Sequence, residues 1–144
     1  MELKYTKGYK YQTDEINRFK VDLSNINRLD LPMLCNPIRF ISYDYNINKF
    51  IIDAGYAWDG PSGPTKDDKT NMRASFEHDV LYQLMRLKIL PRRFRKVADK
   101  QFNETAKEDG MNWFRRRYYL FFLNKGAGFA ANPKNRKKVY TVGH

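Results

Sequence analysis

The chain has 144 residues and a formal net charge of +11, with 42% hydrophobic and 15% aromatic residues. This composition excludes a disordered chain, and no apolar run approaches the ~20 residues that a transmembrane helix needs. Its single cysteine, Cys35, excludes an internal disulfide. The length predicts one domain over residues 1–144, and the positive charge favours anionic partners such as phospholipid surfaces, acidic proteins or nucleic acid.

The first third of the chain, residues 1–56, is predicted to be an irregular segment followed by a β-hairpin. Pro32 argues against a long helix near the N-terminus. Residues 38–45 and 50–56 are rich in β-branched and aromatic side chains, and residues 46–49 between them are typical of a turn. We therefore expect an antiparallel hairpin or a small antiparallel sheet.

Residues 57–69 form a candidate ligand loop. Its centre is Trp58-Asp59-Gly60-Pro61-Ser62-Gly63-Pro64, in which two glycines permit unusual backbone dihedrals and two prolines restrict the remainder. The sequence therefore predicts an ordered loop that is neither helix nor strand. Loops of this kind often present backbone carbonyls or amides to a ligand.

Residues 70–125 are predicted to form a core of three helices, which makes the fold class α+β. The first helix begins at Thr70 or Asn71 and ends near residue 87. The second runs over residues 91–110, between a proline suited to a first helical turn and a closing glycine.

The third helix is expected over about residues 112–123, where aromatic side chains are dense. We expect Phe121 and Phe122 to lie in the core rather than to act as membrane anchors. The glycines of Gly126-Ala127-Gly128 predict the end of the helix, and residues 126–144 then form a basic, extended tail.

Four polar residues of the first two helices make up the candidate site: His78, Asp79, Tyr82 and Asp99. His78 and Tyr82 are spaced by four and share one helix face. If the second helix returns antiparallel, Asp99 reaches His78 and fixes its tautomer, which suits a general base acting on water. Asp79 points about 100° away from His78. Together with carbonyls of the loop it offers the all-oxygen environment that calcium prefers.

The same residues also permit a plainer interpretation. A His–Asp pair between two helices can be only a structural hydrogen bond, and the pattern leaves both readings open. Other chemistries lack their residues: the only other histidine is His144, so a multi-histidine zinc site cannot be assembled. The chain has no G-x-S-x-G elbow, no Walker loop and no dinucleotide fingerprint.

The loop, the H-D-x-x-Y motif from His78 to Tyr82, and Asp99 resemble the pattern of secreted phospholipase A2. The spacing of 21 residues from His78 to Asp99 is similar to that of its short prokaryotic members. The resemblance implies a helical core in which His78 activates the attacking water, Asp99 orients His78, and Tyr82 braces Asp99. It further implies a calcium ion (Ca2+) bound by Asp79 and by carbonyls near Trp58, Gly60 and Ser62.

The chain also resembles a family of small phage and bacterial proteins of unassigned function. The shared motifs are D-G-x-S at residues 59–62, H-D-x-x-Y at 78–82 and A-D-x-x-F at 98–102. This resemblance covers roughly residues 50–125. It implies a phage gene product that is made in the host cytoplasm without a signal peptide and can be incorporated in the virion.

Three functions follow as hypotheses. The first is a calcium-dependent hydrolase of lipid esters, used when a phage enters or lyses its host. The second is a non-catalytic virion component, in the tail or head–tail region, that keeps the scaffold and binds other chains. The third is nucleic-acid binding through basic and aromatic residues, which no recognised motif supports.

Overall fold

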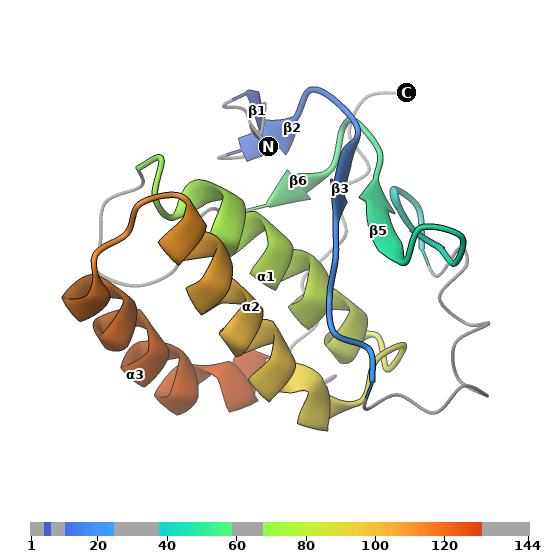
Figure 1. Cartoon of the computed structure of the whole chain (residues 1–144). Coiled ribbons are helices and arrows are strands. Elements are labelled where there is room, and N and C mark those ends of the chain that lie inside the picture. The colour runs from blue at the N-terminus through green and yellow to red at the C-terminus, as the bar shows by residue number, and fades with distance from the viewer. Residues whose placement is uncertain (1–4, 7–10, 25–37, 59–67, 131–144) are drawn as a thin grey trace. The chain divides into compact units, whose positions relative to one another are not determined.

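The computed structural model describes residues 5–6, 11–24, 38–58 and 68–130 (Figure 1). The chain divides into two compact units, with the boundary between Asp59 and Gly60. The described strands lie in the first unit and the helices in the second. The predicted α+β class with a three-helix core is therefore confirmed. Among these residues, none of the helices has both the length and the apolar character required to cross a membrane.

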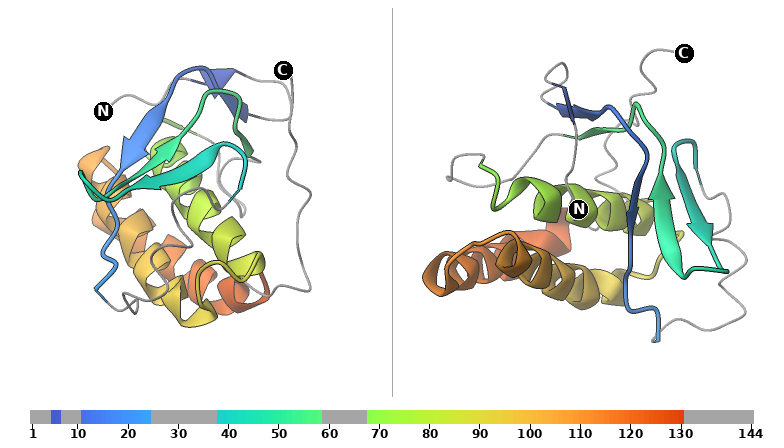
Figure 2. Two further views of the ribbon diagram at one scale, coloured as in Figure 1. Left: turned by 90° about the vertical axis from the view of Figure 1, so that its right-hand side faces the viewer. Right: turned by 45° about the horizontal axis from the view of Figure 1, so that its top comes forward.

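The first unit contains two small antiparallel sheets, each with three described strands (Figure 2). One sheet has the strand order β1-β2-β6 and the other has the order β3-β5-β4. The strands are β1 (Tyr5–Thr6), β2 (Tyr11–Thr13), β3 (Asn17–Phe19), β4 (Ile41–Asp44), β5 (Lys49–Ile52) and β6 (Ala57–Trp58).

The predicted hairpin is confirmed as the β4–β5 pair. Ile41 lies opposite Ile52, and Tyr43 lies opposite Phe50. All four side chains are buried, because side chains two residues apart in a strand point to the same face. β3 adds to this face from the other side of β5, where the rings of Phe19 and Phe50 stack with centroids 5.6 Å apart.

Two expectations for this unit were wrong. The N-terminal segment is not irregular throughout, because β2 and β3 are regular strands within it. Trp58 is not a loop residue: it belongs to β6, pairs with Tyr11 across the sheet and is buried against that ring. The rest of the predicted ligand loop, residues 59–67, lies outside the described residues.

The second unit contains α1 (Met72–Arg86), α2 (Arg95–Glu108) and α3 (Trp113–Ala130), with a short 3-10 helix η2 (Arg92–Phe94) leading into α2. α1 and α2 lie side by side, and α3 follows after a short connection (Figure 1). These positions confirm the three predicted helices. The predicted end of α3 was wrong, because the helix continues through Gly126-Ala127-Gly128. Residues 131–144 of the predicted extended tail lie outside the described residues.

The turns of this unit agree with the predicted boundaries. Pro91 stands directly before η2, where its missing amide hydrogen costs no helical hydrogen bond. Gly110 follows α2 with φ +94°, a left-handed conformation that glycine adopts without steric cost. The connection from α1 to α2 reverses the chain, so α2 runs antiparallel to α1, with Arg73 opposite Asp109 and Tyr82 opposite Asp99.

The beginning of α3 is joined to the beginning of α1 by polar contacts. The Asn71 side chain donates a hydrogen bond to the Tyr119 hydroxyl over 3.1 Å, in a buried position. Arg115 forms an ion pair with Asp68 and also donates to the hydroxyl of Thr70. These contacts fix the first turns of α3 against the segment that leads into α1.

We expect Tyr119→Phe to lower the free energy of unfolding by about 1 to 2 kcal/mol, because the hydroxyl bonds to Arg115 as well as to Asn71. The substitution removes the acceptor of the Asn71 amide and keeps the ring. Urea denaturation measures the change. Tyr118→Phe is the matched control, because the neighbouring Tyr118 is 45% exposed and its hydroxyl forms no hydrogen bond within the described residues. Equal destabilisation by the two substitutions would contradict the prediction.

Candidate functional site

The centre of the candidate site is a hydrogen-bonded group of three side chains. Nε2 of His78 lies 2.7 Å from Oδ1 of Asp99, and the Tyr82 hydroxyl donates to the same oxygen over 2.7 Å. Tyr82 and Asp99 are buried, while the His78 side chain keeps 13% of its surface exposed. The predicted contact between His78, Tyr82 and Asp99 is thus present.

Helix geometry explains why these residues meet. His78 and Tyr82 lie one turn apart on α1, and their rings stack with centroids 4.0 Å apart. Asp99 lies early in α2, which passes α1 in the opposite direction. Phe102, one turn after Asp99, places its ring edge-on to His78 at 5.7 Å. The imidazole ring is therefore held between two aromatic rings and a carboxylate.

Burial and the neighbouring carboxylate keep Tyr82 protonated. Burial raises the pKa of Tyr82, and the negative charge of Asp99 raises it further. Tyr82 therefore keeps its proton and acts as a donor to Asp99. A carboxylate at Asp99 accepts from Nε2 of His78, so neutral His78 carries its proton on that nitrogen. Nδ1 then has a lone pair, which can accept a proton from water.

Of the predicted calcium ligands, Asp79 and Trp58 lie within the described residues. Asp79 follows His78 on α1 and is half-buried. Trp58 lies in strand β6 of the first unit, and Gly60 and Ser62 are outside the described residues. Within the part of the chain that the structure describes, no three His, Cys, Asp or Glu side chains group as metal ligands. Most ligands of the predicted calcium site are backbone carbonyls. Asp79 is the one side chain that the site requires, and its carboxylate oxygens suit calcium.

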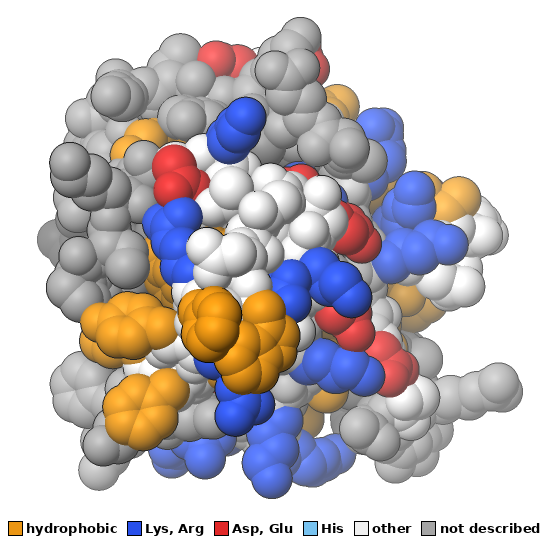
Figure 3. Space-filling model, turned by 60° about the vertical axis from the view of Figure 1, so that its left-hand side comes forward, with side chains coloured by type: hydrophobic (Ala, Val, Ile, Leu, Met, Phe, Trp, Pro, Cys, Tyr) orange, Lys and Arg blue, Asp and Glu red, His pale blue; other side chains and the backbone are white. Residues whose placement is uncertain are grey.

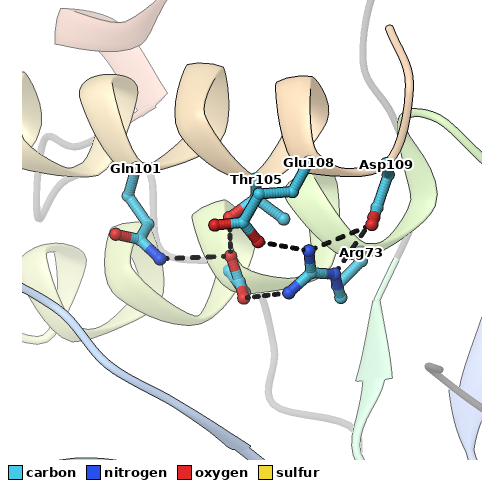
Figure 4. A network of polar contacts seen from close by, with 6 residues as sticks. Arg73, Gln101, Thr105, Glu108 and Asp109 are labelled. Carbon is cyan, nitrogen blue, oxygen red and sulfur yellow. Dashed lines mark hydrogen bonds and ion pairs between the residues drawn. The ribbon is translucent and has the colours of Figure 1, made fainter. Parts of the chain in front are cut away.

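A second polar network joins α1 and α2 on the N-terminal side of His78 (Figure 4). Nε and a terminal nitrogen of Arg73 contact the two carboxylate oxygens of Asp109, each over 3.0 Å, and Arg73 also pairs with Glu108 over 2.8 Å. Glu77 is buried and accepts from Thr105 over 2.5 Å. Burial raises the pKa of Glu77 to about 7, although Thr105 and Arg73 act in the opposite direction.

This network was not predicted from the sequence. Its signal was present in the acidic pair Glu108-Asp109 and in the i, i+4 spacing of Arg73 and Glu77. Both networks join the same two helices. Arg73 lies opposite Asp109, Glu77 opposite Thr105, and Tyr82 opposite Asp99. The polar contacts therefore fix the register in which α2 passes α1, and this register places Asp99 at His78.

Comparisons of the chain with protein-family models, with curated proteins and with solved structures found no match.

Proposed function

We propose that this protein is a phospholipase A2-like hydrolase of phospholipid esters, with calcium as its cofactor and His78 as its general base. The observation that carries the proposal is the pairing of His78 Nε2 with the buried Asp99, to which Tyr82 also donates. This pairing leaves Nδ1 as the nitrogen that can accept a proton. The two sequence resemblances add the substrate class and the use by a phage during entry into or lysis of its host.

The proposed reaction needs one proton to move twice. His78 Nδ1 takes a proton from a water molecule as the water oxygen attacks the carbonyl carbon of the ester. The resulting imidazolium is stabilised by the Asp99 carboxylate, which also accepts a hydrogen bond from Tyr82. His78 then donates the proton to the leaving alkoxide, so that the products are a fatty acid and a lysophospholipid.

Calcium, when bound, polarises the ester carbonyl and stabilises negative charge on its oxygen. Asp79 is the side chain of this chain that would contribute to binding it. The other proposed ligands are the backbone carbonyls of Gly60 and Ser62. Because Asp79 directly follows His78 on α1, the cation and the base would act on the same ester.

The proposal predicts release of fatty acid from phosphatidylglycerol vesicles that requires calcium and stops when a chelator is added. Asp79→Asn is expected to weaken calcium binding at least tenfold, because the substitution removes a charged oxygen ligand. Isothermal titration calorimetry measures the binding without turnover, and fatty-acid release measures activity. Asp14→Asn is the matched control, since Asp14 is exposed in the first unit and should leave both readouts unchanged.

Two results would refute the hydrolase. The first is an absence of calcium-dependent release from vesicles of every headgroup class. The second is calcium binding and release that are unaffected by Asp79→Asn. The first result would favour the non-catalytic virion component, which purified particles test directly because that component must be present in them.

A further inference from the structure

An aromatic surface stands out on α3. Four large aromatic side chains of this helix are strongly exposed: Trp113 by 56%, Phe114 by 79%, Tyr118 by 45% and Phe121 by 60%. We call them the aromatic face of α3. Hydrophobic side chains gather there beside Lys and Arg side chains (Figure 3). The expectation that Phe121 belongs to the core was wrong.

The spacing of these residues places them along one side of α3. Residues 114, 118 and 121 follow the i, i+4, i+7 pattern and lie on one side of the helix, over about 10 Å of its length. Trp113 extends the surface at its N-terminal end, where its ring contacts Phe114 with centroids 5.0 Å apart. Binding that removes these four rings from water would be favoured by the hydrophobic effect.

Charge identifies the chemistry of the partner. Residues 111–144 contain no Asp or Glu and eight basic residues. Of these, Arg115 is paired with Asp68, and Lys134, Arg136, Lys137 and Lys138 lie outside the described residues. On the aromatic face itself, Arg117 is exposed and its guanidinium lies 5.4 Å above the Trp113 ring. The partner must therefore accept aromatic rings and attract positive charge at the same place.

We propose that the aromatic face of α3 docks the protein on anionic phospholipid bilayers. A bilayer interface takes Trp, Tyr and Phe rings at headgroup depth, and anionic headgroups attract arginines beside them. The rings project from the side of a helix, and a fluid bilayer can receive them without a matching groove. The inference extends the proposed lipid hydrolysis by naming its docking surface, and binding can be measured without turnover.

The first test measures binding to vesicles of phosphatidylcholine mixed with phosphatidylglycerol, in the presence of chelator, so that calcium and hydrolysis play no part. Wild type should bind these vesicles and bind phosphatidylcholine alone far more weakly. Phe114→Ser with Phe121→Ser should lower the partition coefficient roughly 10- to 50-fold, because two rings no longer enter the interface. Ile16→Ser with Ile47→Ser is the matched control, since it removes two exposed apolar side chains of the first unit.

Two further measurements test the charge of Arg117 and the insertion of Trp113 into the bilayer. Arg117→Gln should weaken binding about fivefold, and Lys20→Gln, an exposed charge of the first unit, should change it less. Brominated lipids should quench the fluorescence of Trp113, one of only two tryptophans. Quenching should persist in Trp58→Phe and be lost in Trp113→Phe.

The proposal is overturned if wild type does not bind anionic vesicles, or if the double serine variant binds as tightly as its control. Binding of an oligothymidine that depends on Phe114 and Phe121, without vesicle binding, would assign the face to nucleic acid instead. His78→Ala separates docking from catalysis, because it should leave vesicle binding unchanged. Binding without turnover would refute only the hydrolase, and turnover without dependence on the aromatic face would refute only the docking surface.

Discussion

Replacing His78 with alanine is expected to lower calcium-dependent fatty-acid release by about 10³-fold, the usual contribution of a general base. The imidazole is the group whose Nδ1 receives the proton of the attacking water, because Nε2 is occupied by Asp99. No other described side chain forms this arrangement, so water alone must then accept the proton. Initial rates at saturating calcium measure the loss. Circular dichroism checks that the helices remain.

Graded variants separate catalysis from structure. Asp99→Asn keeps the size of the side chain but removes the charge that stabilises the imidazolium, so we expect a loss of about 10²-fold. Tyr82→Phe removes one of the two hydrogen bonds to Asp99 and should cost only about tenfold. Asp14→Asn, an exposed residue of the first unit, should leave the rate unchanged. A His78→Ala rate within tenfold of wild type would exclude His78 as the base.

The contact between His78 and Asp99 was predictable because both helices are marked clearly in the sequence. Pro91 and Gly110 bound the second helix, and the short connection after α1 forces an antiparallel return. A spacing of four then places Tyr82 beside His78 on the facing side. Such a prediction needs only helix periodicity and loop length, and both are local properties of the sequence.

The short strands were not predictable in the same way. β2 has three residues, and its partner β6 lies more than forty positions further along the chain. Three residues are too few to show an alternating pattern, and the pairing is decided by tertiary contact rather than by local preference. Trp58 was therefore assigned to the adjoining loop, although its ring is buried against Tyr11.

The exposed side of α3 was missed for a different reason. Aromatic and leucine side chains fill residues 113–114 and 118–123, so periodicity does not distinguish the buried side from the exposed side. The structure makes the distinction: Tyr119 and Leu123 are buried, while Phe114 and Phe121 are exposed. The end of α3 was missed because glycine only weakens a helix, by about 1 kcal/mol per residue, and does not forbid it.

The buried Glu77 predicts a stability that depends on pH. Its pKa is raised from 4.5 to about 7 in the folded chain, chiefly by burial, so the folded state favours the protonated acid. The stabilising contribution is fully present below pH 4.5 and is lost as the pH rises to about 7. The groups facing Glu77 are Arg73 on its own helix and Thr105, Gln101 and Glu108 on α2.

Glu77→Gln should remove this dependence. We compare the free energy of unfolding of the variant with that of wild type. The variant should gain about 3 kcal/mol relative to wild type between pH 4 and pH 8. Urea denaturation across this range measures it. Glu104→Gln is the matched control, because Glu104 is 56% exposed and pairs with Lys100 at the surface, where such pairs contribute little. A difference that is flat with pH, or that favours wild type as the pH rises, would contradict the prediction.

Glu77→Gln should change the stability of the protein without changing its activity. The amide oxygen of glutamine can still accept the hydrogen bond from Thr105, so the register between α1 and α2 is kept. His78, one residue further along α1, then still meets Asp99. At neutral pH we therefore expect Glu77→Gln to hydrolyse lipid within about twofold of the wild-type rate. A large loss of activity with preserved stability would mean that Glu77 itself takes part in the reaction.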